Sequence, residues 1–195
     1  MEHIILASAS PRRKEILSLA DLSFEVMPSN VREVITKEAP NEVVMELSSQ
    51  KARDIWNKIK EKKIVVGADT VVSYDGKILG KPADEEDAAR MLSMLSGSMH
   101  RVYTGVTIIC EGKEISFYEE TKVYFYPLDD EEIQAYIPTG EPMDKAGAYG
   151  IQGKAAVFIR GIEGDYYNVV GFPIARFMRE MKKIQSGERD TIWEK

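Results

Sequence analysis

Cysteine and histidine are scarce in this sequence, which holds one cysteine and two histidines among its 195 residues. A single thiol forms no intramolecular disulfide, so the chain is not a disulfide scaffold, and we expect it in a reducing, cytoplasmic compartment. Cys110 lies in an apolar run and is expected in the core. Neither His3 nor His100 has a cysteine or a second histidine near it, so the ligand spacing of a zinc site is absent.

Long apolar runs, an excess of basic charge and the common phosphate-loop motifs are also missing. No apolar stretch reaches the length that spans a membrane, and the first residues lack the basic flank and apolar core of a signal peptide. The 26 basic residues are outnumbered by 32 acidic ones, and the net charge of -6 argues against a surface for nucleic-acid polymers. Neither the Walker nor the Rossmann glycine pattern occurs.

Apolar runs alternate with helical patterns along the chain, which indicates an α/β fold. Strands are predicted at residues 4–7, 24–28, 64–68, 71–74, 102–110, 115–126 and 155–160. Helices are predicted from residue 11, from about 40 to 60, from 84 to 97, from 129 to 137 and from 173 onward. We expect a mixed sheet folded into two lobes around a cleft, in one domain over residues 1–185, with a polar tail at residues 186–195.

The segment SASPRR at residues 8–13 places hydroxyl and guanidinium groups at the junction between the first strand and the first helix. Ser10 suits the N-cap of that helix and Pro11 its first turn, so the free N–H groups and the positive end of the dipole face the loop. Arg12 and Arg13 add charge to an end that favours anions, which indicates a phosphate or carboxylate site. The alternative is a capped helix with solvated arginines.

An acid and two lysines give further signals. The segment GADT at residues 67–70 follows an apolar strand, so Asp69 is expected at the carboxyl end of that strand, where open α/β sheets bind ligands. A carboxylate there can hold a divalent metal or accept a proton, or it can form an Asx-type turn. Lys81 is held between a glycine and a proline, and Lys51 either leans into a site or extends to water. Glu33 lies in a polar loop and gives no signal by itself.

The segment DKAGAYGIQG at residues 144–153 contains three glycines, which bend the chain tightly and let a ligand approach the backbone. Gln152 lies between Ile151 and Gly153 and offers a donor and an acceptor side by side. That pair matches the N3–H and O4 edge of uracil or thymine, and it also suits adenine. The alternative is a mobile loop with an exposed amide.

Seven segments occur in a fixed order along nearly the whole chain. They are SASPRR at residues 8–13, KA at 51–52, GADTVV at 67–72, GKP at 80–82, YTG at 103–105, DKAGAYGIQG at 144–153 and NVVGFP at 168–173. In this combination the chain resembles the Maf family of nucleoside triphosphate pyrophosphatases, also described as septum-formation inhibitors.

This resemblance implies an elongated, strongly curved mixed sheet with flanking helices and two lobes around a cleft, similar to inosine triphosphate pyrophosphatases. It also implies hydrolysis of a nucleoside triphosphate to the monophosphate and pyrophosphate, with Mg²⁺ or Mn²⁺ as cofactor. The subgroup of the family that acts on dTTP and UTP has Arg, Thr and Gln at its specificity positions, where the 7-methyl-GTP subgroup has Trp, Gln and Glu. Arg12, Thr70 and Gln152 match the pyrimidine pattern.

The resemblance assigns expected roles to the remaining motif residues. Asp69 is the expected general base, because the family's proton acceptor is at this position, and Asp69 with Glu33 is expected near the metal. Charge-assisted hydrogen bonds to the phosphates are expected from a further set of residues, namely Ser8, Arg13, Lys51 and Lys81.

The expected partners follow from the same resemblance: a nucleoside triphosphate as substrate, no nucleic-acid polymer, no membrane, and by family habit a second copy in a homodimer. An alternative function stays open, since the same pocket would serve a nucleotide-binding regulator of cell division or septum formation in which hydrolysis is incidental. Turnover separates the two, because a regulator needs no general base at Asp69.

Overall fold

One seven-stranded mixed sheet organises the chain in the computed structural model, which describes residues 3–59 and 63–186. The strands are β1 (Ile4–Leu6), β2 (Phe24–Val26), β3 (Ile64–Tyr74), β4 (Lys77–Leu79), β5 (Met99–Cys110), β6 (Lys113–Phe125) and β7 (Ile159–Glu163). The α-helices are α1 (Pro11–Ser18), α2 (Pro40–Trp56), α3 (Glu85–Leu95), α4 (Asp130–Tyr136), α5 (Tyr166–Val170) and α6 (Ile174–Ser186). Short 3₁₀ helices cover Ile137–Thr139, Glu141–Asp144, Ala146–Ala148 and Lys154–Phe158.

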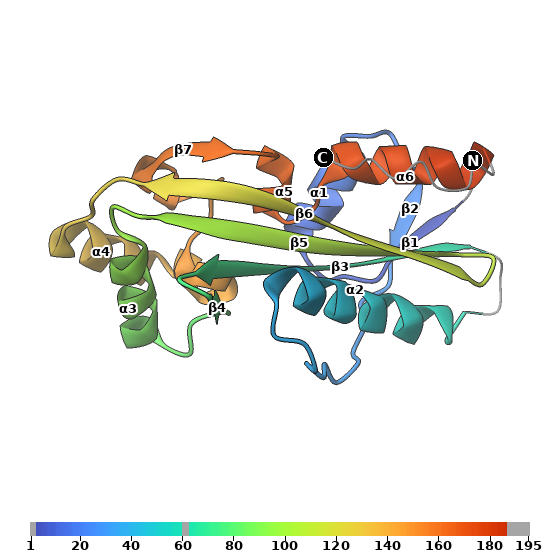
Figure 1. Cartoon of the computed structure of the whole chain (residues 1–195), viewed down its shortest axis with the longest axis horizontal. Coiled ribbons are helices and arrows are strands. Elements are labelled where there is room, and N and C mark those ends of the chain that lie inside the picture. The colour runs from blue at the N-terminus through green and yellow to red at the C-terminus, as the bar shows by residue number, and fades with distance from the viewer. Residues whose placement is uncertain (1–2, 60–62, 187–195) are drawn as a thin grey trace.

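The pairing of the strands changes from parallel to antiparallel at β3. Strands follow the order β2-β1-β3-β5-β6-β7, with β4 paired to β3. β1 runs parallel to β2 and β3, whereas β3, β5, β6 and β7 pair antiparallel. The long strands β3, β5 and β6 twist across the whole molecule and give it an elongated shape (Figure 1). The predicted mixed α/β fold is confirmed.

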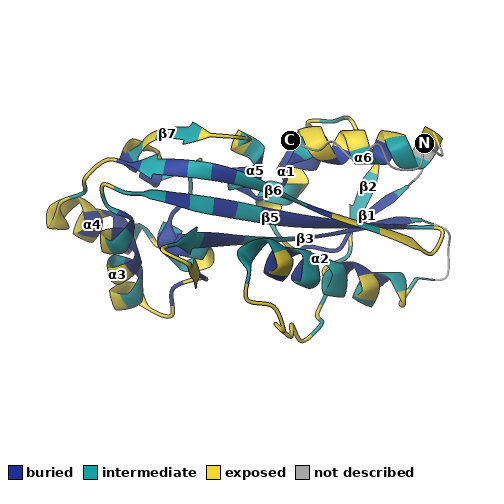
Figure 2. Ribbon diagram, in the orientation of Figure 1, coloured by how far each residue is buried: buried dark blue, intermediate teal, exposed yellow. Residues whose placement is uncertain are grey.

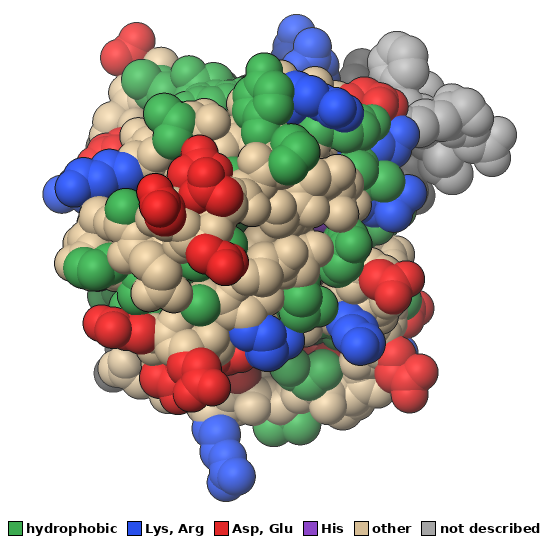
Figure 3. Space-filling model, turned by 90° about the vertical axis from the view of Figure 1, so that its left-hand side faces the viewer, with side chains coloured by type: hydrophobic (Ala, Val, Ile, Leu, Met, Phe, Trp, Pro, Cys, Tyr) green, Lys and Arg blue, Asp and Glu red, His purple; other side chains and the backbone are tan. Residues whose placement is uncertain are grey.

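Helices cover both faces of the sheet (Figure 1), and buried residues run along the long strands (Figure 2). The buried apolar residues described by the structure form three clusters. At one end, α1 and α6 pack on β1, β3 and β5 around Leu17, Phe172 and Phe177. At the other end, α3 and α4 pack on the same long strands around Leu92 and Phe125. α2 lies on the face opposite α6 (Figure 1). Seen from the end with α3, α4 and β7, acidic and basic side chains are interspersed on the surface (Figure 3).

α2 lies against the sheet at two glycines, and this contact positions the cavity described below. A Cβ at Gly67 of β3 would lie 2.2 Å from the carbonyl oxygen of Ser48, and one at Gly105 of β5 would lie 2.3 Å from that of Val44. The Ser48 hydroxyl lies 2.8 Å from the Thr107 hydroxyl in the same buried contact. Helix and strand backbones therefore touch directly, which no residue with a side chain would allow.

The strand that carries Asp69 is longer than predicted. Residues 64–74 form one strand, and Asp69 pairs with Gly105 of β5 in its middle. The expectation that Asp69 ends a strand, and the alternative of an Asx-type turn, are therefore both wrong. β1 stops at Leu6, opposite Val66, so Asp69 lies beyond the end of the neighbouring parallel strand. Asp69 therefore lies at the carboxyl end of the parallel strand β1, and this is the edge of the sheet at which open α/β folds bind ligands.

Three other local predictions differ from the structure. The strand expected at residues 155–160 is a 3₁₀ helix up to Phe158, because Ala155 and Phe158 are buried at the three-residue spacing of that helix. The Ser10 side chain makes no cap hydrogen bond, although Pro11 begins α1 as expected. α2 ends at Trp56 rather than near residue 60. The predicted tail begins with Ser186, the last residue of α6, and residues 187–195 lie outside the described residues.

None of the described helices is long and apolar enough to cross a membrane.

The glycine contact predicts a large difference between two otherwise similar substitutions. Gly105→Ala should lower the free energy of unfolding by about 1–3 kcal/mol or more, because its Cβ collides with the α2 backbone. Gly161→Ala in β7 is the matched control, since nothing lies within 4 Å of its added Cβ. Urea denaturation of both variants checks this, and equal stability of the two would contradict the close packing of α2.

Candidate active site

A cavity of about 530 Å³ lies where α2, β3, the first helix and the glycine-rich segment meet. Eight of the nine residues singled out from the sequence line it: Arg12, Arg13, Glu33, Lys51, Asp69, Thr70, Lys81 and Gln152. The ninth, Ser8, is buried behind the wall and accepts a hydrogen bond from Arg13 at 3.0 Å. The structure thus brings together groups that lie up to 144 residues apart in the chain.

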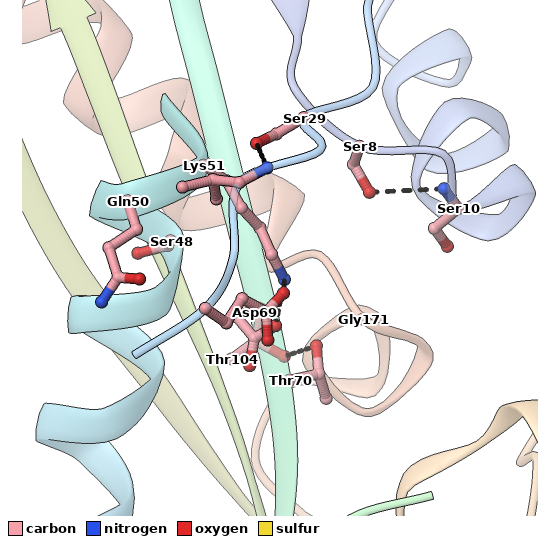
Figure 4. Close-up of polar contacts among 12 residues, drawn as sticks. Ser8, Ser10, Ser29, Ser48, Gln50, Lys51, Asp69, Thr70, Thr104 and Gly171 are labelled. Atoms are coloured by element: carbon pink, nitrogen blue, oxygen red, sulfur yellow. Dashed lines mark hydrogen bonds and ion pairs between the residues drawn. The ribbon is translucent and has the colours of Figure 1, made fainter. Parts of the chain in front are cut away.

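A lysine lies between two carboxylates at one side of the cavity. The Lys51 Nζ atom is 2.5 Å from Asp69 Oδ1 and 3.0 Å from Glu33 Oε1. The side chains of Lys51 and Asp69 are largely buried, at 16% and 14% exposure. Lys51 reaches from α2 to Asp69 on β3 (Figure 4), because the helix is seated on the sheet at Gly67. Lys51 therefore leans into the site instead of extending to water.

Three side chains on one face of α2 hold the loop that carries Glu33. Gln50 accepts from the backbone N–H of Val34 at 3.0 Å and donates to the Val34 carbonyl at 2.6 Å, as a neighbouring strand would. Further along the loop, Glu46 accepts from the Thr36 N–H at 2.9 Å. Asp54 accepts from the Ser29 hydroxyl at 2.7 Å. Residues 46, 50 and 54 are four apart, so the sequence places their side chains on one face of the helix, and this spacing could have identified that face.

Arg13 joins three segments behind the cavity. Its guanidinium donates to the Gly171 carbonyl at 2.9 Å, to the Ser8 hydroxyl at 3.0 Å and to the Thr70 hydroxyl at 3.1 Å. Burial lowers the pKa of this guanidinium from its ordinary value, and the Asp69 carboxylate opposes that shift. A guanidinium has five N–H donors, so Arg13 retains donors for a ligand.

The Thr70 hydroxyl belongs to the same hydrogen-bonded chain. It lies 2.9 Å from the Thr104 hydroxyl, which donates to the Asn168 carbonyl at 2.9 Å. Asn168 is buried and its amide donates to the Val102 carbonyl and to the Thr121 hydroxyl. Thr104, Asn168 and Gly171 lie in motif segments of the sequence, but the sequence alone gave them no role.

Arg12 points away from Arg13, toward the glycine-rich segment. Its Nη1 atom is 3.3 Å from Asp144 Oδ2, and the Lys145 ammonium is 2.6 Å from Asp144 Oδ1. All three side chains line the cavity. Partial burial alone would raise the pKa of Asp144, but the hydrogen bond and charge of Lys145 and the charge of Arg12 outweigh it and hold that pKa below its ordinary value.

The glycine-rich segment is held by hydrogen bonds of Glu141 and by a buried contact of Tyr149. The Glu141 carboxylate accepts from the Tyr136 hydroxyl at 2.9 Å and from the Lys154 N–H at 2.9 Å. The Tyr149 hydroxyl lies 2.7 Å from His100 Nε2 on β5. The Gln152 side chain lines the cavity and its amide has no partner among the described residues. The loop is therefore pinned, and the amide that was predicted to meet a base is available.

The donor set for a metal is small. Within residues 3–59 and 63–186, no group of three or more histidine, cysteine, aspartate or glutamate side chains is placed to hold an ion. Asp69 and Glu33 lie close enough together to share the Lys51 ammonium. Two carboxylates fit Mg²⁺ or Mn²⁺ when phosphate oxygens and water complete the shell, because these hard ions prefer oxygen ligands. Lys51 shows that this position attracts a cation.

Comparison with known proteins finds relatives over nearly the whole chain. A family model described as Maf-like protein matches residues 3–184. The dTTP/UTP pyrophosphatase of Bacillus cytotoxicus is 54% identical over 188 residues, covering 96% of this chain and 98% of the relative. That of Agathobacter rectalis is 53% identical over 201 residues, covering 94% and 98%. A HAM1 protein from Coxiella burnetii has a similar fold, with a TM-score of 0.51 at 13% identity over 96% of this chain and 100% of its own.

The buried histidine behind the cavity predicts a pH-dependent loss of stability. Burial lowers the pKa of His100 to about 3. The unfolded chain, with an ordinary histidine pKa of about 6.5, takes up this proton first, so the contribution of neutral His100 is complete above that pH and is lost as the pH falls toward 3. Between pH 6.5 and 4, His100→Gln should therefore lose less unfolding free energy than the parent, by up to about 3 kcal/mol.

Urea titrations at several pH values measure this difference. His3→Gln is the matched control, because it removes the chain's other histidine, whose side chain is 41% exposed and does not line the cavity. Acid-side slopes that are equal in the parent and His100→Gln would contradict a neutral buried His100.

Proposed function

The chain belongs to the family of Maf-like proteins, and from that premise we propose that it hydrolyses dTTP and UTP to the nucleoside monophosphate and pyrophosphate. Relatives that are more than 50% identical over nearly the full length of both chains carry the name dTTP/UTP pyrophosphatase, which supports this substrate class. Since these relatives are named as enzymes, a regulator with incidental hydrolysis is not favoured.

The charge of the cavity is the observation that carries the proposal. The whole chain is acidic, with a net charge of -6. Nevertheless, cations outnumber acids in the cavity: the former are Arg12, Arg13, Lys51, Lys81 and Lys145, and the latter are Glu33, Asp69 and Asp144. A pocket that concentrates positive charge within an acidic protein favours a small polyanion such as a triphosphate over a long nucleic acid.

Binding of the phosphates is the proposed role of the cations near β3. Arg13 has donors left after its three internal hydrogen bonds, and Lys81 is exposed at the cavity wall. Ser8 orients Arg13 through the 3.0 Å hydrogen bond. Held by such fixed donors, the α-phosphate is presented to a water molecule in one orientation, which removes much of the entropic cost of the reaction.

Asp69 is the proposed general base. Its carboxylate accepts the proton of a water molecule whose oxygen attacks the α-phosphorus, while the bond from that phosphorus to the bridging oxygen breaks and pyrophosphate leaves. The Lys51 ammonium, 2.5 Å from Asp69 Oδ1, orients the carboxylate and places positive charge beside the reacting phosphate. The position of Asp69 within a paired strand and its ion pair with Lys51 support this role.

We propose Mg²⁺ or Mn²⁺ as cofactor, held by Asp69 and Glu33 together with phosphate oxygens of the substrate. When bound, such an ion neutralises the charge that develops on the phosphates.

We assign selection of the base to Arg12, Thr70 and Gln152. The Thr70 hydroxyl also accepts a hydrogen bond from Arg13 at 3.1 Å, which connects it to the phosphate-binding residues. The homodimer and the cytoplasmic location expected from the sequence stay predictions.

Replacement of the general base tests the mechanism. Asp69→Asn should lower kcat for UTP and dTTP by roughly 10²- to 10⁴-fold while binding of the product UMP changes little, because the amide cannot accept the proton. Pyrophosphate release in the presence of Mg²⁺ or Mn²⁺ measures the rate. Asp87→Asn is a matched control, since Asp87 also pairs with a cation, Arg90, but lies on α3 outside the cavity.

Three outcomes would contradict the proposal. Full activity in Asp69→Asn would remove the general base, and orthophosphate as the first product would place the cleaved bond elsewhere. A higher kcat/KM for 7-methyl-GTP than for UTP would show that Arg12, Thr70 and Gln152 do not identify the pyrimidine subgroup. A panel of canonical and modified triphosphates with product identification, run on the parent and on Asp69→Asn, covers all three.

A further inference from the structure

Arg12, Asp144 and Lys145 form a row of charged groups at the cavity wall. Both oxygens of the Asp144 carboxylate are engaged, one with Lys145 Nζ at 2.6 Å and the other with Arg12 Nη1 at 3.3 Å. The carboxylate is still 62% exposed, so it has lone pairs available to a ligand. The row therefore offers a donor, an acceptor and a donor, in that order.

The row is built on fixed supports. The Lys145 ammonium also donates to the Glu141 carbonyl at 2.9 Å. Its stem lies across Gly150, where an added Cβ would be 2.6 Å from Lys145 Cε. Glu141 is itself held by Tyr136 and by the Lys154 N–H. Lys145 is consequently 15% exposed, with one ammonium hydrogen left after its two hydrogen bonds.

The polarity of these groups is fixed, whereas that of Gln152 is not. A glutamine amide can rotate and exchange its donor and acceptor, so Gln152 pairs equally well with the N3–H and O4 of uracil or with the N4–H₂ and N3 of cytosine. Guanidinium and ammonium groups only donate, and an ionised carboxylate only accepts. Discrimination between uracil and cytosine therefore requires groups of fixed polarity, namely guanidinium, ammonium or carboxylate groups.

We propose that Asp144 and Lys145 act with Arg12 as a donor–acceptor–donor row that selects uracil and thymine over cytosine. Uracil and thymine present an acceptor, a donor and an acceptor at O4, N3–H and O2, which complements the row at all three positions. In this arrangement N3–H donates to Asp144, and the Gln152 amide donates to the second lone pair of O4. Cytosine presents a donor and two acceptors, so two of its three groups face groups of the same kind. The inference deepens the proposed function and rests on it, since it assumes that the cavity holds a pyrimidine nucleotide.

The substitution Asp144→Asn tests the row, because an amide of the same shape both donates and accepts. We expect kcat/KM for UTP to fall on the order of ten- to a hundredfold, and the ratio of CTP to UTP activity to rise by a similar factor. Asp144→Glu retains the carboxylate and should keep the preference for UTP over CTP, even where its overall activity falls. Asp87→Asn, on α3, should leave the ratio unchanged.

Binding of the products UMP and CMP, measured by calorimetry, gives a second readout that needs no turnover. Asp144→Asn should weaken UMP binding and narrow the difference between UMP and CMP. Equal losses for both nucleotides, or an unmoved ratio in a variant that melts at the parent temperature, would overturn the inference and reduce Asp144 to a support of the loop. The parent enzyme separates this from the proposed function: if it releases no pyrophosphate from UTP or dTTP, the proposed function itself fails.

Discussion

The direct contact between the backbone of α2 and the sheet is the constraint on which the site depends. Because Gly67 and Gly105 lack side chains, α2 lies against β3 and β5 at a distance that no other residue permits. Lys51 is one turn beyond Ser48, the residue that touches Gly67, and this places its ammonium on Asp69. The outer face of the same helix holds the loop of Glu33. One helix thus brings both Lys51 and the loop of Glu33 to Asp69 on β3.

The charged side chains of the cavity hold one another in place through ion pairs. Glu33 and Asp69 share Lys51, and Asp144 lies between Arg12 and Lys145. A half-buried charge without a partner is costly. The carboxylates therefore stabilise the cations, which would otherwise need a phosphate as their partner. Under the proposed function, phosphates replace these carboxylates as partners of the cations, so the cations are already oriented when the substrate binds.

The sequence predicts the residues of the site better than their geometry. The apolar runs predict the α/β fold and the motifs predict eight of the lining residues, because both signals depend on local sequence. Asp69 was expected to end a strand, since GADT contains turn-forming residues, but nine paired residues of β5 extend β3 through it. The prediction of a strand at 155–160 is wrong up to Phe158, because over so short a run the two-residue period of a strand cannot be distinguished from the three-residue period of a 3₁₀ helix. Glu141 and Thr104 act only through distant partners, so no local pattern identifies them.

Under the proposed function, the two adjacent arginines of α1 serve the two ends of the nucleotide. Successive residues of a helix point about 100° apart, so Arg13 turns to β3 and the Gly171 carbonyl while Arg12 turns across the cavity to Asp144. A displacement of α1 would therefore disturb the phosphate end and the base end together. Under the proposed function, contacts to the base hold the helix that orients the phosphate donors, and binding energy gained far from the cleaved bond contributes to its alignment. Base selection then acts on the rate of the reaction as well as on the affinity for the substrate.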